Sequence, residues 1–439
     1  MYTYKNLNFR NNILPISLLG IFLLTSFNSI FNSFSVALGG SVNSTTFLMP
    51  PFDLFGDYFK AVFSFDSNSL LRFNLKYFDK LSNVLNEYLQ NNNYKTINAV
   101  TGMPSNLNGM PLSTAYYALN LRAMTVINPL VLYVVNILFI LTLICLVINE
   151  LIVRPRDKLF LLFAIALSYP FLFFLVRGHL FSWFTTLSLF AYLVALKNKH
   201  LNMALFFLAI ACNFRPNAII FFSLLLLVIQ NNIIISGFKS FIKFGAIFIV
   251  IFIPSLVIAN YFYAPYTFIN FTQAVANYHS NYVLGNAGLA YGSSLHGLIK
   301  VIFLNSNNNE VLILIFTFIC VCLAGFFYIK KYLNGLSFIF IISSFYCLAT
   351  SVFADYYLGI FFLPLIFICM MTSQEKNIST VNIVQIFSCI LLLSPKNYLY
   401  FSSGISYQVL INPLILCCAL VWTYKDALNN SKTHRLNNS

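Results

Sequence analysis

Apolar runs long enough to cross a lipid bilayer recur along most of this chain, and this feature limits its fold more than any other. A membrane-spanning helix needs about 20 consecutive, mostly apolar residues. Of the 439 residues, 59% are hydrophobic and only 8% are charged, whereas roughly a quarter of the residues of a soluble protein are charged. The sequence therefore predicts an all-α polytopic membrane protein, a single integral-membrane domain over residues 1–439.

Breaking the apolar runs at charged residues, proline and glycine predicts about twelve transmembrane helices. The first run is too long for the apolar region of a signal peptide, so we expect a retained helix. The predicted spans are approximately 13–36, 124–149, 158–176, 179–196, 201–214, 217–236, 241–262, 310–329, 335–352, 356–372, 378–394 and 408–424. The span 201–214 is short, which allows it to be tilted, re-entrant or continuous with a neighbour.

The basic residues orient this layout. The net charge is +14, and the positive side chains are scattered singly and in pairs rather than gathered into a patch. Every second predicted turn carries Lys or Arg, the pattern of cytoplasmic loops. We therefore expect both termini in the cytoplasm and no nucleic-acid partner. High usage of Asn, Ile, Lys and Phe suggests an AT-rich bacterial genome, hence a bacterial cytoplasmic (inner) membrane.

Two loops on the predicted outer side are long, residues 37–123 and 263–309. The first holds five of the 11 acidic residues, namely Asp53, Asp57, Asp66, Asp79 and Glu87. The sequence contains no glycine-rich nucleotide-binding motif, and its nine cysteines lie in apolar runs without metal-ligand spacing to histidine. We expect any chemistry on the outer face.

The stretch PPFDLFGDYFK, residues 50–60, places Asp53 and Asp57 four positions apart. Residues 53–66 carry apolar side chains at helical spacing, which predicts a helix in the membrane interface with both carboxylates on its polar face. A second amphipathic segment follows. Asp53 also suits a helix N-cap, and Asp57 an ion pair with Lys60. The functional interpretation makes one aspartate a general base toward a hydroxyl nucleophile, which the other holds or tunes.

Charged and polar side chains also interrupt the apolar runs at their predicted outer ends. They are Arg177, His179, Arg215 and Asp355. Ionisable groups at membrane depth are costly and are usually paired or functional. Each also suits an interfacial turn with a side chain reaching toward water, and His179 suits a plain hydrogen-bonding role. Together, two arginines near carboxylates suit an anionic phosphate leaving group.

Four pieces of sequence carry a resemblance to a known family. They are PPFDLFGDYFKA, RGHLFSWFTTLSLF followed by ACNFRPNAIIF, GLAYGSSLHGLIKVIF, and ATSVFADYYLGIFFLPL. With these, the chain resembles the GT-C superfamily of integral-membrane glycosyltransferases, and within it the polyprenol-phosphate-mannose-dependent mannosyltransferases (glycosyltransferase family 87) and bacterial relatives. The likeness spans most of the chain. It departs from the family where Gly178-His179 replaces Gly-Gln and Arg215-Pro216 replaces Lys-Pro. In the fourth piece, Asp355-Tyr356-Tyr357 stands where the family usually has Trp-Asp-His-His or a Tyr variant.

The resemblance implies a GT-C-like fold with an outward-facing active site. It implies an inverting, metal-independent transfer of a mannose-like hexose from a polyprenyl-phosphate donor to a glycan or glycolipid hydroxyl, with no other cofactor. The catalytic residue would be Asp53 or Asp57. The substrate-binding residues would be Arg177, His179, Arg215, His296, Asp355 and Tyr356.

Two other classes fit parts of the pattern. An O-antigen or capsule repeat-unit polymerase shares the size, the apolar content and the arginines in outer loops. A twelve-helix transporter or lipid-linked oligosaccharide flippase also keeps both termini inside. A transporter of that kind usually shows two similar halves, which this sequence lacks, and has no use for a long carboxylate-bearing first loop.

Overall fold

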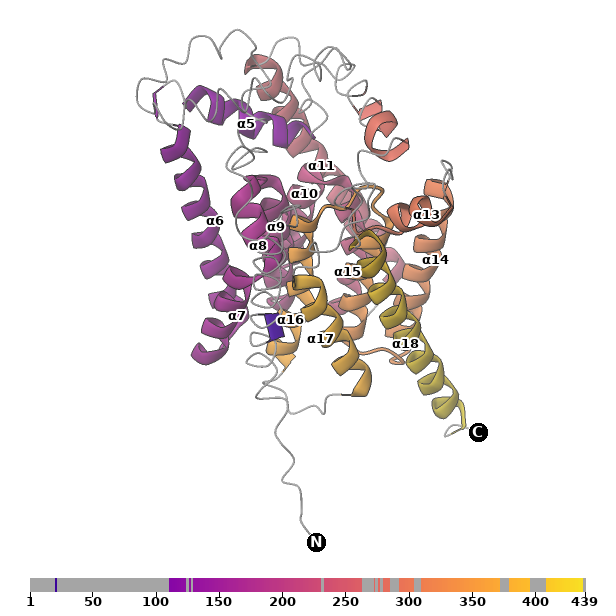
Figure 1. Ribbon diagram of the computed structural model, residues 1–439. Coiled ribbons are helices and arrows are strands. Elements are labelled where there is room, and N and C mark those ends of the chain that lie inside the picture. The colour runs from indigo at the N-terminus through magenta and orange to yellow at the C-terminus, as the bar shows by residue number, and fades with distance from the viewer. Residues whose placement is uncertain are drawn as a thin grey trace, which may run out of the picture.

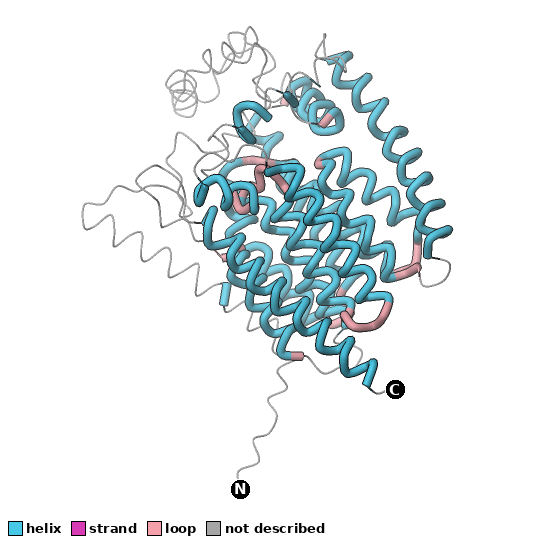
Figure 2. Tube along the Cα trace, turned by 90° about the vertical axis from the view of Figure 1, so that its right-hand side faces the viewer, coloured by secondary structure: helices cyan, strands magenta, loops and turns pink. Residues whose placement is uncertain are grey.

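The computed structural model describes residues 20–21, 110–123, 126–127, 129–229, 233–262, 272, 275–276, 279–284, 292–303, 309–371, 379–394 and 408–436. Within these ranges nearly every residue is helical and no strand is formed (Figure 2). Most of the predicted first span, the predicted interfacial helices of residues 53–88, and most of the 263–309 loop lie outside the described residues.

Five of the described helices are long and apolar enough to cross a membrane. They are α6 (Pro129–Leu151), α9 (Leu180–Lys197), α11 (Ile233–Phe262), α14 (Asn309–Ile329) and α18 (Gln408–Leu436). The pair α7 (Pro155–Leu167) and α8 (Tyr169–Arg177) adds a sixth if it counts as one span. The structure supports a helical membrane protein, and the count of twelve spans stays a prediction.

Shorter helices complete the described bundle. They are α5 (Pro111–Ala123), α10 (Leu201–Phe214), α13 (Leu295–Phe303), α15 (Gly335–Ala349), α16 (Phe362–Met371) and α17 (Thr380–Leu393), with 3-10 helices η2 (Pro216–Leu227) and η4 (Asp355–Phe361) and a π-helical turn η3 (His279–Leu284). Helix α10 has the predicted bounds 201–214, and its 14 residues confirm that this element is short.

The helices run between two ends of the bundle (Figure 1). At the end that we call the lower end, the Lys197 ammonium donates to the carbonyl oxygens of Glu150 at 2.7 Å and Leu151 at 3.0 Å, which joins two turns. The upper end carries α5, α13 and the junctions α8–α9, α10–η2 and α15–η4 (Figure 1). Chain direction therefore alternates between the two ends along the long described helices (Figure 1).

Burial separates the interior helices from those at the periphery. Each of these helices contains an apolar stretch of 18 residues. Of this stretch, 72% is buried in α9, but only 11% in α11 and 22% in α14. Trp183 and Phe190 of α9 have no exposed surface. Because apolar side chains on α11 and α14 remain exposed, we expect these two helices to face lipid.

Three spans that the sequence predicts as continuous are broken in the structure. The predicted helix 217–236 is the 3-10 helix η2 as far as Leu227, and α11 already begins at Ile233. The predicted helix 158–176 bends by 56° between α7 and α8, because Pro170 lacks the N–H that would continue the α7 hydrogen bonds. The predicted helix 356–372 begins as the 3-10 helix η4 and becomes α-helical only at Phe362. The 3-10 helix η4 lies at the upper end, and α8 runs from the break at Ser168 to the upper-end junction with α9.

Helix α5 belongs to the C-terminal part of the predicted first outer loop and was not predicted. It lies across the upper end (Figure 1) and packs against α10 and α11. The Tyr116 hydroxyl donates to Asn136 Oδ1 on α6, and Asn136 Nδ2 donates to Asn120 Oδ1 at 2.8 Å. This polar network fixes the end of the loop to the first long described helix.

Candidate functional site

The α8–α9 junction places His179 at the upper end. Helix α8 ends at Arg177 and is capped by Gly178, whose φ of 74° lies in the left-handed region. Glycine adopts this conformation without the steric cost of a Cβ atom. The His179 ring stacks on Tyr356, with ring centroids 4.1 Å apart and an interplanar angle of 13°. Tyr356 also stacks on Phe173 of α8, at 5.8 Å. The predicted residues His179 and Tyr356 are therefore neighbours.

The α10–η2 junction places Arg215 nearby. Its backbone is extended, with φ −148° and ψ 105°, as expected for a residue that precedes proline. The guanidinium Nη2 donates to the carbonyl oxygen of Val352 at 2.8 Å. The guanidinium carbon lies 3.5 Å from the ring centroid of Tyr357 and 5.3 Å from that of Phe353. An aromatic platform and a carbonyl group thus hold a permanent positive charge at the upper end.

The connection Thr350–Ala354, which we call the 350–354 segment, receives the Arg215 bond. It forms no regular helix, so its backbone groups bond to neighbouring elements. Ser294 Oγ donates to the Ser351 carbonyl at 3.1 Å, and the Ser293 N–H donates to the Phe353 carbonyl at 2.8 Å. Asn217 Nδ2 donates to Thr350 Oγ1 at 3.1 Å. The segment is therefore held by Asn217 of η2 and by the two serines that directly precede α13.

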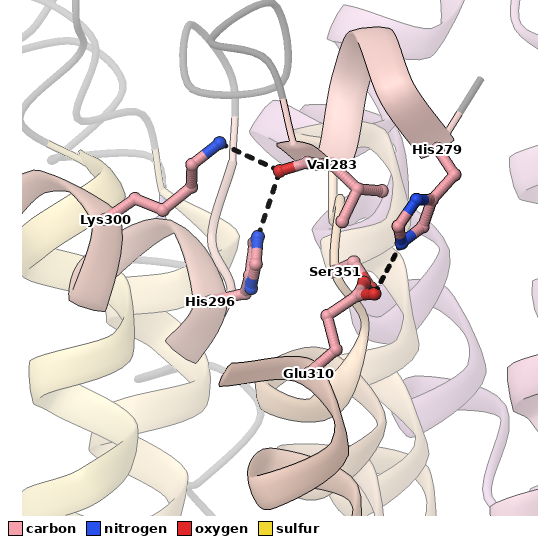
Figure 3. Close-up of polar contacts among 6 residues, drawn as sticks. All are labelled: His279, Val283, His296, Lys300, Glu310 and Ser351. Carbon is pink, nitrogen blue, oxygen red and sulfur yellow. Dashed lines mark hydrogen bonds and ion pairs between the residues drawn. The ribbon is translucent and has the colours of Figure 1, made fainter. Parts of the chain in front are cut away.

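A second polar cluster surrounds Glu310, at the start of α14 (Figure 3). One carboxylate oxygen accepts from the Ser351 hydroxyl, and the other pairs with His279 Nε2 of η3 at 2.6 Å. We call Glu310, His279 and Ser351 the Glu310 cluster. Since Ser351 belongs to the 350–354 segment, this cluster is connected to the Arg215 site.

Two side chains of α13 converge on a single carbonyl of η3 (Figure 3). His296 Nε2 donates to the Val283 carbonyl oxygen at 3.1 Å, and the Lys300 ammonium donates to the same oxygen at 2.8 Å. The two residues are four positions apart and so lie on one face of the helix. Burial lowers the pKa of Lys300 below its ordinary value, and the negative charge of Glu310 acts in the opposite direction.

The structure brings together part of the predicted site. His179, Arg215 and Tyr356 lie around the upper-end junctions. His296 lies on α13, which directly follows the two serines that contact the 350–354 segment. Helix α8 ends at Arg177 and η4 begins at Asp355, so both backbones reach the same end, but these two side chains lie outside what the structure describes.

The predicted catalytic residues Asp53 and Asp57 also lie outside the described residues. Within the described part of the chain, no group of three or more His, Cys, Asp or Glu residues could hold a metal ion.

Sequence reasoning missed the residues that connect these parts. Glu310 stands at the start of an apolar run, as Asp355 does, so the same pattern could have identified it as a candidate site residue. His279 lies in a Tyr- and Asn-rich stretch with no pattern, and Ser351 is an ordinary residue at a helix end. His279 and Ser351 lie 31 and 41 residues from Glu310 in the sequence. Contacts over such separations cannot be predicted from the local spacing of residues.

No protein-family model, curated protein or solved structure matches this chain significantly. The resemblance to the GT-C superfamily therefore stays a hypothesis that the residues themselves carry.

Proposed function

We propose that this chain is an integral-membrane glycosyltransferase. It moves a mannose-like hexose from a polyprenyl-phosphate carrier to a hydroxyl of a lipid or glycan on the extracytoplasmic face. The observation that supports this proposal best is the Arg215 site. A guanidinium fixed by the Val352 carbonyl and the Tyr357 ring lies beside the His179–Tyr356 stack, at one end of an apolar bundle.

The chemistry of the transfer gives a fixed arginine a role. The acceptor hydroxyl attacks the anomeric carbon, the bond from that carbon to the phosphate oxygen breaks, and the configuration inverts. Asp53 or Asp57 takes the hydroxyl proton. The polyprenyl phosphate gains one negative charge as it leaves, so a positive group held in place stabilises the transition state more than the bound donor.

The charge distribution supports the sidedness in the proposal. The described turns at the lower end carry Arg154, Arg156, Lys197, Lys199, Lys330 and Lys331. Short loops rich in Lys and Arg usually stay in the cytoplasm, which supports the proposal that the upper end lies outside. Nucleotide sugars are cytoplasmic, so a transferase that works outside needs a donor already carried across on a lipid. The membrane in this proposal is the bacterial inner membrane.

A transfer assay tests the proposal. Membranes that contain the wild-type chain receive a polyprenyl-phosphate hexose labelled in the sugar, and the labelled glycan or glycolipid product is quantified. Asp53→Asn and Asp57→Asn are compared with wild type. The variant that lacks the base loses about a hundredfold or more of the rate. Asp426→Asn is the matched control, because this carboxylate lies on α18 toward the lower end and bonds to Asn430 at 3.3 Å.

The other outcomes are decisive as well. If both outer-loop variants keep the wild-type rate, the catalytic assignment is wrong. If transfer requires a diphosphate-linked oligosaccharide and lengthens the product by whole repeat units, the chain is a polymerase. If the lipid-linked sugar crosses the bilayer with no new covalent product, the chain is a transporter or flippase.

A further inference from the structure

Glu310 and Arg215 bind adjacent residues of the 350–354 segment. The carboxylate accepts from the Ser351 hydroxyl, and the guanidinium donates to the carbonyl of Val352. We propose that Glu310 is a positioning residue for Arg215, acting through Ser351. This inference rests on the proposed role of Arg215 in holding a phosphate. It adds that a residue of another helix, Glu310 of α14, keeps Arg215 in the position that this role requires.

The 350–354 segment makes such an effect possible because its conformation is set from outside. Each residue of a chain has two soft backbone dihedrals, and here no helical hydrogen bond fixes them between α15 and η4. The contacts from Ser293, Ser294 and Asn217 hold backbone groups and the Thr350 hydroxyl. The Ser351 hydroxyl donates to the Glu310 carboxylate. Loss of this bond leaves Ser351, the neighbour of the residue whose carbonyl orients Arg215, held only through its backbone contact with Ser294 among the contacts described above.

The hydrogen-bonding partners of Glu310 suit a carboxylate. His279 of η3 pairs with one oxygen, and His296 and Lys300 of α13 interact with the carboxylate electrostatically. An ionised carboxylate offers acceptors only, so it suits the Ser351 hydroxyl and the His279 N–H together. Charge-assisted hydrogen bonds of this kind are roughly twice as strong as neutral ones. The 350–354 segment is therefore tied to the start of α14.

Three substitutions separate the two halves of the Glu310 cluster. Ser351→Ala removes only the link to the 350–354 segment and leaves the Glu310–His279 pair. His279→Phe removes only that pair. Glu310→Leu removes both. If Glu310 positions Arg215 through Ser351, Ser351→Ala and Glu310→Leu displace the Arg215 guanidinium equally. His279→Phe then displaces it less.

The first test needs no activity. Hydrogen–deuterium exchange of the detergent-solubilised full chain reports the protection of amides in peptides that cover residues 350–354. Exchange there is about threefold to tenfold faster in Ser351→Ala and Glu310→Leu, as expected when one hydrogen bond is lost. Glu150→Leu, at the exposed lower end of α6, is the matched control and leaves these peptides unchanged. Unchanged exchange in Ser351→Ala, which is the mildest variant, overturns the inference.

The second test uses transfer. Ser351→Ala raises the KM for the lipid-linked donor by about threefold to tenfold, and the effect disappears in an Arg215→Lys background because the arginine that it orients is gone. Equal effects in both backgrounds mean that Ser351 acts independently of Arg215, which contradicts the inference. If the wild-type chain forms no product at all, the proposed function fails, and the exchange test still decides whether Glu310 orders the segment.

Discussion

Arg215 Nη2 lies 2.8 Å from the carbonyl oxygen of Val352, a residue 137 positions later in the chain. The contact joins the α10–η2 junction to the α15–η4 connection, and the Tyr357 ring covers the same guanidinium at 3.5 Å. An arginine with several N–H donors in one plane can keep the Val352 bond and still bind a phosphate oxygen. Lysine has a single ammonium on a flexible stem and cannot reproduce this geometry.

We therefore predict that Arg215→Lys lowers the kcat/KM of transfer by about tenfold to a hundredfold, because a contact to the developing phosphate charge is misplaced. The control is Arg156→Lys, since Arg156 also lies over an aromatic ring, Phe160 at 5.3 Å, but at the lower end. Steady-state kinetics with varied donor concentration measure both. Equal losses in the two variants would point to a general effect on folding.

The sequence predicted the helical bundle because apolar length and charge decide which segments can cross a membrane. Residues 201–214 and the start of the helix at residue 335 match the structure. The break at Ser168 was missed because a proline in a membrane helix is compatible with either a kink or the start of a new helix. The dipeptide Tyr169-Pro170 does not distinguish these two outcomes. Helix α5 was missed because its face is mixed, and it is stabilised by packing on α10 and α11.

The site was predicted only where one residue stood out locally. Arg215 and His179 interrupt apolar runs, and both lie at the upper end as expected. Glu310 and Ser351 form their contact 41 residues apart, across a chain reversal whose geometry no periodicity encodes. Pairings of this kind depend on tertiary packing, so the sequence alone could name the ends of helices but could not say which of them meet.

The His179–Tyr356–Phe173 stack is expected to stabilise the upper end. Aromatic pairs contribute about 0.5–1.5 kcal/mol beyond the area that they bury. Tyr356→Leu therefore lowers the thermal midpoint of the detergent-solubilised protein by a few degrees, whereas Tyr356→Phe keeps the ring and stays close to wild type. Differential scanning fluorimetry compares the two. A midpoint for Tyr356→Leu equal to that of Tyr356→Phe would show that the stack contributes little.

Docking of α5 is expected to weaken at alkaline pH. Burial raises the pKa of Tyr116 to about 12, although a hydrogen bond with Asn120 acts to lower the pKa. The unfolded chain releases this proton near pH 10, with the ordinary tyrosine pKa of about 10. The folded state binds the proton more tightly, so the stabilisation is fully present below pH 10 and is lost as pH rises toward about 12.

Thermal unfolding over that alkaline range measures this effect as the difference between wild type and Tyr116→Phe. The wild-type advantage shrinks as pH rises, because the phenolate can no longer donate to Asn136 Oδ1. Tyr261→Phe is the control, since this tyrosine is 80% exposed. A difference that stays constant with pH would contradict the prediction.

Labelling of single cysteines tests the sidedness. In a background without the nine native cysteines, Ser280→Cys lies on η3 at the upper end and Asn198→Cys lies in the α9–α10 turn at the lower end, and both positions are exposed. A maleimide that cannot cross the membrane reacts in intact cells with Cys at 280 and reaches position 198 only after lysis. The reverse pattern would place the Arg215 site in the cytoplasm.

The most direct measurement is the product formed by the purified wild-type chain in lipid vesicles, with a polyprenyl-phosphate hexose as the only sugar donor. We predict a new glycosidic product whose anomeric configuration, read by nuclear magnetic resonance, is opposite to that of the donor. We also predict that product formation falls sharply in Arg215→Gln and persists in Arg156→Gln. The absence of any glycosidic product, or a product with the donor's configuration, would contradict these predictions.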